Sequence, residues 1–190
     1  MSLKTNTNYL FQLTEVHRKN DLLDNSFDTF LSDKKSEGYY SNESIEKGIY
    51  KLGVNCFENS FFSKNVSSAM IPVMLIKSIL ILLLFVVLAL FTDHKTLSSL
   101  MQVALPLTIL QQTIRLITYH FRVKAVYEHF KLIFTSVNSK IRDSYLITNV
   151  INYETTLAWA GILLDSKKFD DLNESLTKEW EEIKINHKIN

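Results

Sequence analysis

Few side chains in this sequence could do chemistry, and their spacing matches no catalytic or metal site. Zinc sites need clustered ligands, yet no i,i+4 pair beside a cysteine or carboxylate occurs among the histidines His17, His94, His120, His129 and His187. The sequence also has no phosphate-binding glycine loop, no G-x-S-x-G elbow and no C-x-x-C motif. We therefore expect neither enzyme activity nor a bound metal or cofactor.

One group of polar side chains lies inside an apolar stretch. Its members are spaced three or four residues apart, so they share one helix face: Thr108, Gln111, Gln112 and Arg115. Pro106 precedes them and has no backbone N–H, which leaves the carbonyl of Gln102 without its helical partner. The sequence predicts a helix break at Pro106, with Gln102 before it and a polar stripe beyond it.

Two interpretations of this polar stripe remain open. In the first, it marks the end of a membrane span, and Arg115 simply reaches the lipid headgroups. In the second, it lines an aqueous path or a helix contact between several copies of the chain. Lys77, on the preceding helix, is expected at a depth similar to that of Arg115. These two cations would favour anions at the mouth of such a path.

The polar stripe belongs to the weaker of two predicted membrane spans. The first span, Ile71–Phe91, contains the run ILILLLFVVLALF, which has no polar side chain, and Pro72 lies at its start. Its length of about 21 residues matches a hydrocarbon core of about 30 Å. The second span, Leu97–Arg115, follows a turn so short that the chain must return antiparallel. We therefore expect one transmembrane hairpin.

The distribution of charge predicts the orientation of this hairpin. In the turn, the charge of Lys95 is balanced by the nearby Asp93, so the turn has little net charge. The opposite side of the hairpin carries several cations: Lys64, Lys77, Arg115, Arg122 and Lys124. By the positive-inside rule, both termini are cytoplasmic in a multi-pass protein of the cell (inner) membrane. The formal net charge of +1 gives no reason to expect nucleic acid as a partner. The expected partner is the lipid bilayer.

Amphipathic patterns predict two helices before the hairpin. The first is a polar helix over Tyr9–Asp24, and the second covers Ser41–Phe62, with Ser41 or Asn42 as its N-cap. The single cysteine, Cys56, falls on the apolar face of the second helix. It is expected to be a small core residue.

Further helices are predicted after the hairpin. The second span continues to about residues 138–142, and Tyr145–Leu164 follows with Asn and Glu side chains that favour packing or the interface over spanning. Gly161 is expected to interrupt it. A closing helix over Asp171–Ile185 would be capped by Asp170 or Asp171. Its apolar face comprises Leu172, Leu176, Trp180 and Ile183.

These patterns predict an all-α membrane protein with one transmembrane helical hairpin and a cytoplasmic helical bundle formed by N- and C-terminal helices. Residues 1–65 would form cytoplasmic or interfacial helices, residues 66–120 the hairpin, and residues 121–190 a cytoplasmic helical region. Because two spans cannot enclose water, a pore would need several copies, and a homo-oligomer is expected.

Four parts of the sequence can be compared with a known family: FDTFLSDKKSEGYYSNESIEKGIYKLGVNCFENSFFS, the two predicted spans, NYETTLAWAGILLDSKKF and LTKEWEEIK. Together they resemble the S-4TM family, bacterial four-transmembrane proteins regarded as pore-forming effectors of nucleotide-signalling defence systems against phage. The resemblance covers about residues 22–184 and corresponds to the C-terminal half of the family, with the second pair of spans. It implies a membrane-disrupting effector whose partner is a nucleotide-signalling protein or another subunit.

Two functions are therefore expected to compete. In the first, the chain is a pore-forming effector of bacterial anti-phage defence and acts as an oligomer. In the second, the hairpin only anchors a cytoplasmic helical bundle, which serves as a scaffold or binds a partner.

Overall fold

The computed structural model describes residues 3–32, 40, 42–91 and 100–189, without the side chains of residues 3–12, 88–89, 91 and 100–106. The described residues are all-helical, as the scarcity of glycine and proline predicts. The helices are α1 (Leu3–Phe27), α2 (Ile49–Phe91), α3 (Leu100–Ser136), α4 (Ser139–Ala160) and α5 (Ser166–Asn186).

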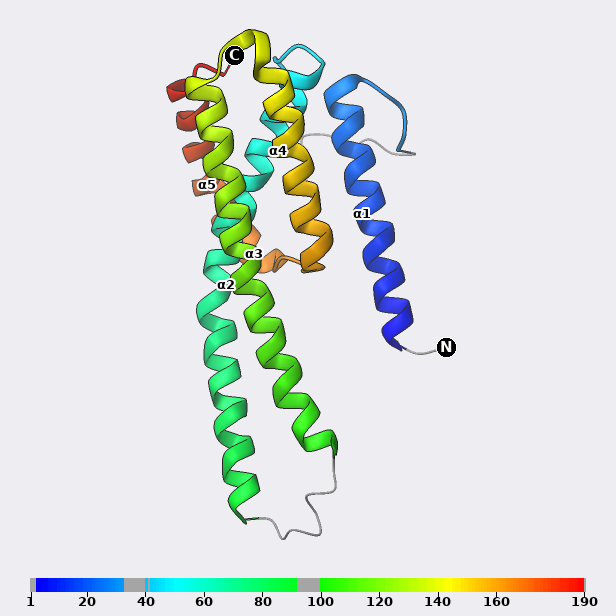
Figure 1. Cartoon of the computed structure of the whole chain (residues 1–190), viewed down its shortest axis with the longest axis vertical. Helices are drawn as coiled ribbons and strands as arrows, with labels where there is room; N and C mark the ends of the chain where they lie inside the picture. The colour runs from blue at the N-terminus through cyan, green and yellow to red at the C-terminus, as the bar shows by residue number, and fades with distance from the viewer. Residues whose placement is uncertain (1–2, 33–39, 41, 92–99, 190) are drawn as a thin grey trace.

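Two long helices form the axis of the molecule. α2 has 43 residues and α3 has 37, and they pack side by side in opposite directions. The other helices lie around one end of this pair, which we call the bundle, and the first turns of α1 reach past it (Figure 1). The other end of the pair extends further. We call this extension the projection; it comprises residues 71–91 of α2 and 100–115 of α3. The predicted boundaries at residues 65 and 120 thus fall inside α2 and α3.

Aromatic side chains fill the core of the bundle. The centre of the Phe57 ring on α2 lies 5.3 Å from that of Tyr127 and 5.4 Å from that of Phe134, both on α3. It lies 5.2 Å from the centre of the Trp180 ring on α5. Cys56 is buried beside it, as predicted. The predicted apolar face of the closing helix is confirmed, because its four residues belong to the core or pack against it.

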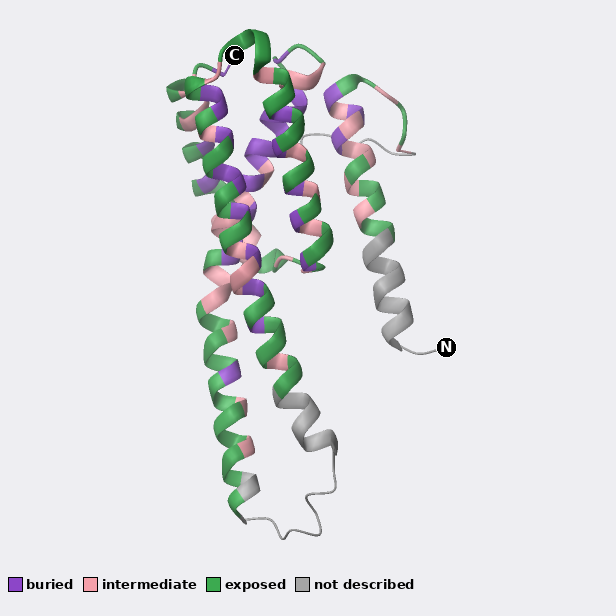
Figure 2. Ribbon diagram, viewed as in Figure 1, coloured by how far each residue is buried: buried purple, intermediate pink, exposed green. Residues whose placement is uncertain are grey.

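The projection has almost no core of its own. Figure 2 shows its described residues as mostly exposed, whereas the buried residues gather in the bundle. Leu83 on α2, for example, is 56% exposed although its neighbours along the chain are also apolar. In the described part of the chain, α2 is the one helix long and apolar enough to cross a membrane.

The region before the first span differs from its prediction. α2 begins at Ile49 and runs without interruption, so Pro72 lies well inside a helix rather than at a helix start. Of the two predicted caps, Ser41 lies outside the described residues and Asn42 does not cap the helix. The Asn42 amide is buried and donates to Asn55 Oδ1 at 3.0 Å and to Glu58 Oε2 at 2.6 Å. These side-chain bonds between residues distant in sequence override the local capping preference.

The predictions for the chain after residue 115 are mostly confirmed. α3 continues past Arg115 to Ser136, and α4 ends at Gly161, whose φ of 55° suits glycine. The closing helix, however, begins earlier than predicted. Asp165 is its N-cap and accepts from the Lys168 N–H at 3.0 Å, so the prediction of Asp170 or Asp171 as the cap is wrong.

Candidate pore-lining surface

A hydrogen bond between two small polar residues aligns the helices of the projection. The Ser78 hydroxyl of α2 lies 2.6 Å from the Thr113 hydroxyl of α3, and both residues are buried. The Thr113 hydroxyl also donates to the carbonyl of Ile109, at 3.0 Å. Small hydroxyl residues let two helices approach closely and satisfy one another in an apolar environment. This contact fixes the rotation of α3 about its axis.

The rotation divides the described part of α3 within the projection into three faces. One face, with Ile109, Thr113 and Leu116, is buried or partly buried towards α2. A second face is apolar and exposed and comprises Leu107, Leu110 and Ile114. The third is the predicted polar stripe of Thr108, Gln111, Gln112 and Arg115, all exposed. The polar stripe is therefore separate from both the α2 contact and the apolar face.

The structure places the four residues of the predicted polar stripe on one exposed face of α3. Among the described residues, Gln111, Gln112 and Arg115 make no hydrogen bond or ion pair. The main chain stays helical through residue 106, while the side chains of Gln102 and Pro106 lie outside the described ones. The local break at Pro106 and the role of Gln102 therefore stay predictions.

Lys77 and Arg115 come to similar levels along the projection. Lys77 directly precedes Ser78, and Arg115 follows Thr113 by two positions on a helix of opposite direction. With a rise of about 1.5 Å per residue, both lie within roughly 3 Å of the Ser78–Thr113 level, towards the bundle. Both side chains are exposed. A copy of the chain thus presents two cations at one depth.

The hydroxyl pair itself was not predicted from the sequence. Ser78 and Thr113 each interrupt an apolar stretch, which is a signal typical of helix contacts in membranes. The two residues are 35 positions apart. Whether they meet depends on how the chain turns between the two helices, and no local sequence pattern specifies that.

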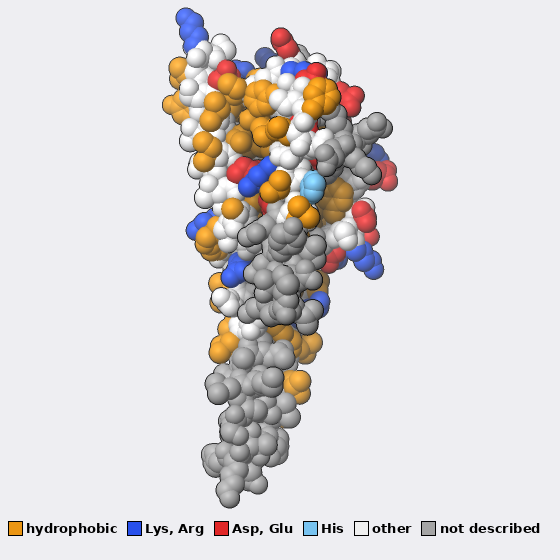
Figure 3. Space-filling model, turned by 90° about the vertical axis from the view of Figure 1, so that its right-hand side faces the viewer, with side chains coloured by type: hydrophobic (Ala, Val, Ile, Leu, Met, Phe, Trp, Pro, Cys, Tyr) orange, Lys and Arg blue, Asp and Glu red, His pale blue; other side chains and the backbone are white. Residues whose placement is uncertain are grey.

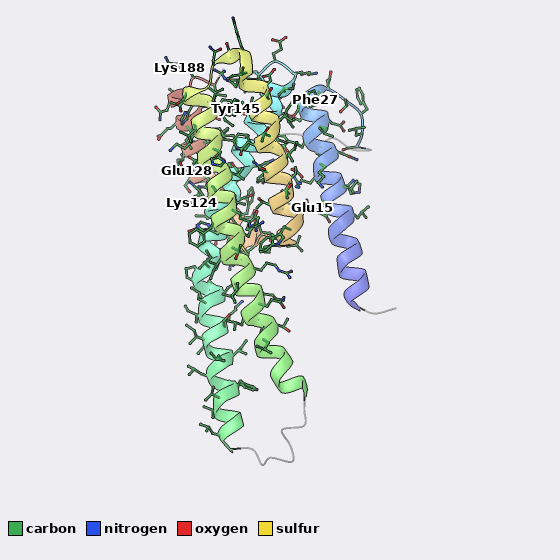
Figure 4. All side chains as sticks on the ribbon, in the orientation of Figure 1. Glu15, Phe27, Lys124, Glu128, Tyr145 and Lys188 are labelled. Carbon is green, nitrogen blue, oxygen red and sulfur yellow. The ribbon has the colours of Figure 1, made fainter. Side chains whose placement is uncertain are left out.

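A second polar site lies in the bundle, between α1 and α4. The Arg18 guanidinium lies 2.6 Å from Glu154 Oε2 and 3.0 Å from Glu15 Oε2. Figure 4 shows Glu15 on the side of α1 that faces α4. A cavity of about 330 Å³ adjoins this site, and its lining includes Arg18, Ser63, Tyr119, Tyr153, Leu157 and Phe169.

In this second site, the charge of Arg18 is neutralised by the carboxylates of Glu15 and Glu154. Burial alone would lower the pKa of Arg18, but its hydrogen bonds to Glu154 and Glu15 and the charge of Glu154 outweigh burial and raise that pKa. Burial raises the pKa of Tyr153 well above its usual range, and its hydroxyl lies 3.2 Å from that of Ser63. Because two carboxylates already neutralise Arg18, this cavity offers no free cation to an anionic ligand. As a functional site, this cavity is therefore a weaker candidate than the polar stripe.

No three histidine, cysteine or carboxylate side chains in the described part of the chain are grouped so that they could hold a metal ion. Comparisons with protein-family models, with characterised proteins and with solved structures found no match to this chain.

Proposed function

We propose that the projection crosses a lipid bilayer and that several copies associate into a membrane-disrupting pore. The observation that carries this proposal is the polar stripe, exposed on a face of its own beside an apolar face of the same helix. Polar side chains in a bilayer face protein or water rather than lipid. Association of copies would turn the polar stripes inward and leave Leu107, Leu110 and Ile114 towards lipid.

The exposed apolar surface of α2 supports insertion of the projection. Leu80, Leu82, Leu83 and Leu84 are each at least half exposed, and burying an exposed leucine side chain in an apolar phase stabilises it by about 1.5–3 kcal/mol. Residues 71–91 and 100–115 contain no Asp or Glu, and the Asp and Glu side chains coloured in Figure 3 lie over the bundle. With the bundle in the cytoplasm, both termini lie on that side of the cell membrane.

The resemblance to the S-4TM family supports the biological setting of this pore. On that basis the protein is an effector of bacterial anti-phage defence, and a nucleotide-signalling protein or partner subunit triggers it. The expected result of triggering is loss of the membrane potential. In induced and infected cells, a normal potential together with proven insertion would refute the effector function.

The proposal is tested by removing the polarity of the stripe. Gln111→Leu, Gln112→Leu and Arg115→Leu, combined, should abolish dye release from vesicles that contain the protein while leaving insertion intact. The matched control changes the neighbouring apolar face by Leu107→Ile, Leu110→Ile and Ile114→Leu, and should release dye like the wild type. Equal dye release by both triple variants, under conditions in which the wild type releases dye, would refute the pore.

The alternative is a membrane-anchored scaffold, favoured by the extensive packing of the bundle around Phe57. In that case the projection only tethers the bundle. Replacing residues 71–115 by an unrelated apolar hairpin would then preserve function, whereas a pore would be lost. The same replacement thus separates the two functions.

A further inference from the structure

The connection between α4 and α5 lies where the bundle meets the projection. Figure 1 shows this segment at the end of the bundle from which α2 and α3 extend. The backbone N–H of Asp165 contacts the Met70 sulfur at 3.4 Å. Met70 directly precedes Ile71, the first residue of the expected span. The connection is therefore at the level where the hydrocarbon core would begin.

Three large apolar side chains are exposed at this level. Leu163 in the connection is 65% exposed, Trp159 at the end of α4 is 47% exposed and Phe121 on α3 is 62% exposed. Phe121 belongs to the same level because its neighbour His120 lies 3.1 Å from the Ser67 hydroxyl, less than one turn from Met70. The Arg122 guanidinium lies 4.1 Å from the centre of the Trp159 ring and joins α3 to α4 here.

We propose that Phe121, Trp159 and Leu163 form a second membrane contact, which lies in the headgroup layer of the leaflet that α2 enters. We call these three residues the interfacial surface. The inference rests on the proposed insertion of the projection but adds a contact made by the bundle itself. Its partner is the interface of a bilayer that contains anionic phospholipid.

The chemistry of the interfacial surface fits the headgroup layer. Trp is enriched at membrane interfaces because its ring is apolar and its N–H is polar. Arg122, which contacts the Trp159 ring, adds a cation at the same level, and an anionic membrane surface attracts such a cation. The headgroup layer is about 5–8 Å thick on each side of the core, so residues adjoining Met70 fall within it.

A contact of this kind would hold the bundle at a defined depth and tilt. The projection alone allows the chain to slide and tilt, because an apolar stretch specifies no single angle. A second contact on one side of the projection removes that freedom. It would also present the polar stripes of neighbouring copies at a common height.

Spin labels at three exposed leucines test this inference. Leu83→Cys lies in the projection, Leu163→Cys in the interfacial surface and Leu132→Cys in the bundle, and the three leucines are 56%, 65% and 60% exposed. The protein is reconstituted into vesicles of mixed zwitterionic and anionic phospholipid. Depth is read from the ratio of accessibility to oxygen and to a water-soluble nickel complex. Cys56 is fully buried, so the unsubstituted protein controls for labelling.

The expected result is a high ratio for Leu83→Cys, an intermediate ratio for Leu163→Cys and a low ratio for Leu132→Cys. If Leu163→Cys matches Leu132→Cys while Leu83→Cys stays high, the interfacial surface is refuted and insertion of the projection stands. If Leu83→Cys is as low as Leu132→Cys, the proposed insertion fails as well.

Tryptophan fluorescence gives a second measurement without labels. Lipids brominated near the headgroup should quench Trp159, whereas Trp180 is fully buried in the core and supplies the remaining emission. Trp159→Phe should remove the quenched fraction. Unchanged quenching in Trp159→Phe would count against the interfacial surface.

Discussion

Arg18 on α1 and Glu154 on α4 form a bidentate ion pair, with Nη1 and Nη2 of Arg18 donating to the two carboxylate oxygens at 3.0 and 2.6 Å. The two residues are 136 positions apart in the sequence. α1 packs mainly on α2, and this pair also connects it to α4. The first prediction concerns its contribution to stability.

Glu154→Gln should lower the free energy of unfolding by about 1–2 kcal/mol, because it leaves a largely buried guanidinium with weaker partners. Thermal unfolding in detergent micelles, followed by circular dichroism, measures the change. Glu174→Gln is the control: Glu174 pairs with Lys178 at 2.7 Å but is 87% exposed, so its loss should cost less than about 0.5 kcal/mol. Equal losses in the two variants would contradict the prediction.

Gly53 allows α2 and α4 to pack closely. A Cβ at this position would lie 2.6 Å from Cδ2 of Leu146, so the fully buried Leu146 side chain would have to shift. Gly53→Ala should therefore destabilise the protein by about 1–3 kcal/mol. Ser68→Ala, at an exposed helical position, should be nearly neutral in the same unfolding measurement.

A double variant tests the cause of this effect. Leu146→Ala alone should cost about 2–5 kcal/mol through the cavity that it leaves. If the clash with Leu146 is responsible, Gly53→Ala combined with Leu146→Ala should cost less than the sum of the two single changes. Additive costs would mean that Gly53 acts in another way.

Asp24 should make stability depend on pH in the acid range. Burial alone would raise the pKa of Asp24, but hydrogen bonds from the Leu31 N–H at 2.8 Å, the Thr29 hydroxyl at 2.7 Å and the Ser32 N–H at 2.8 Å outweigh it and lower that pKa. A carboxylate with a lowered pKa in the folded state stabilises it above the unfolded pKa of about 4. This stabilisation is lost as the pH falls through the folded value.

Asp24→Asn should therefore be less stable than the wild type at neutral pH by about 1–2 kcal/mol, and the difference should shrink below about pH 4. Unfolding measured across the acid range checks this. Asp171→Asn, at an exposed site on α5, serves as the control. A difference that stays constant from neutral to acid pH would exclude this role for Asp24.

The last prediction concerns ion selectivity. Lys77 and Arg115 lie at one level, so a pore of several copies should carry a positive ring that favours anions. Lys77→Glu with Arg115→Glu should shift the reversal potential in a planar bilayer towards the cation value. Lys124→Glu changes a charge on the bundle, where Figure 4 labels Lys124, and should leave selectivity unchanged. An unchanged reversal potential in the double variant would rule out the positive ring.

Some parts of the fold could be predicted because their causes are local. Gly161 ends α4 because glycine adopts its left-handed backbone conformation without the steric cost of a Cβ. The spacing of Leu172, Leu176 and Trp180 already defined an apolar face before a partner was known. The polar stripe could likewise be predicted, because helical geometry alone places residues three and four apart on one face.

Other parts depended on contacts that no local pattern encodes. Pro72 favours a helix start, yet α2 continues through it. A proline frees the carbonyl four residues before it, here that of Ser68, which is an exposed residue. Asn42 favours a cap, yet its buried bonds to Asn55 and Glu58 use the same side chain.

The sequence by itself determined that this chain is helical, that one stretch is apolar enough for a membrane, and that polar residues form a stripe beside it. These are properties of side-chain type and helical period. Only the tertiary structure decided that Ser78 faces Thr113 and that the α4–α5 connection contacts Met70. Such pairings join residues far apart in the chain, and the packing of the whole bundle selects them.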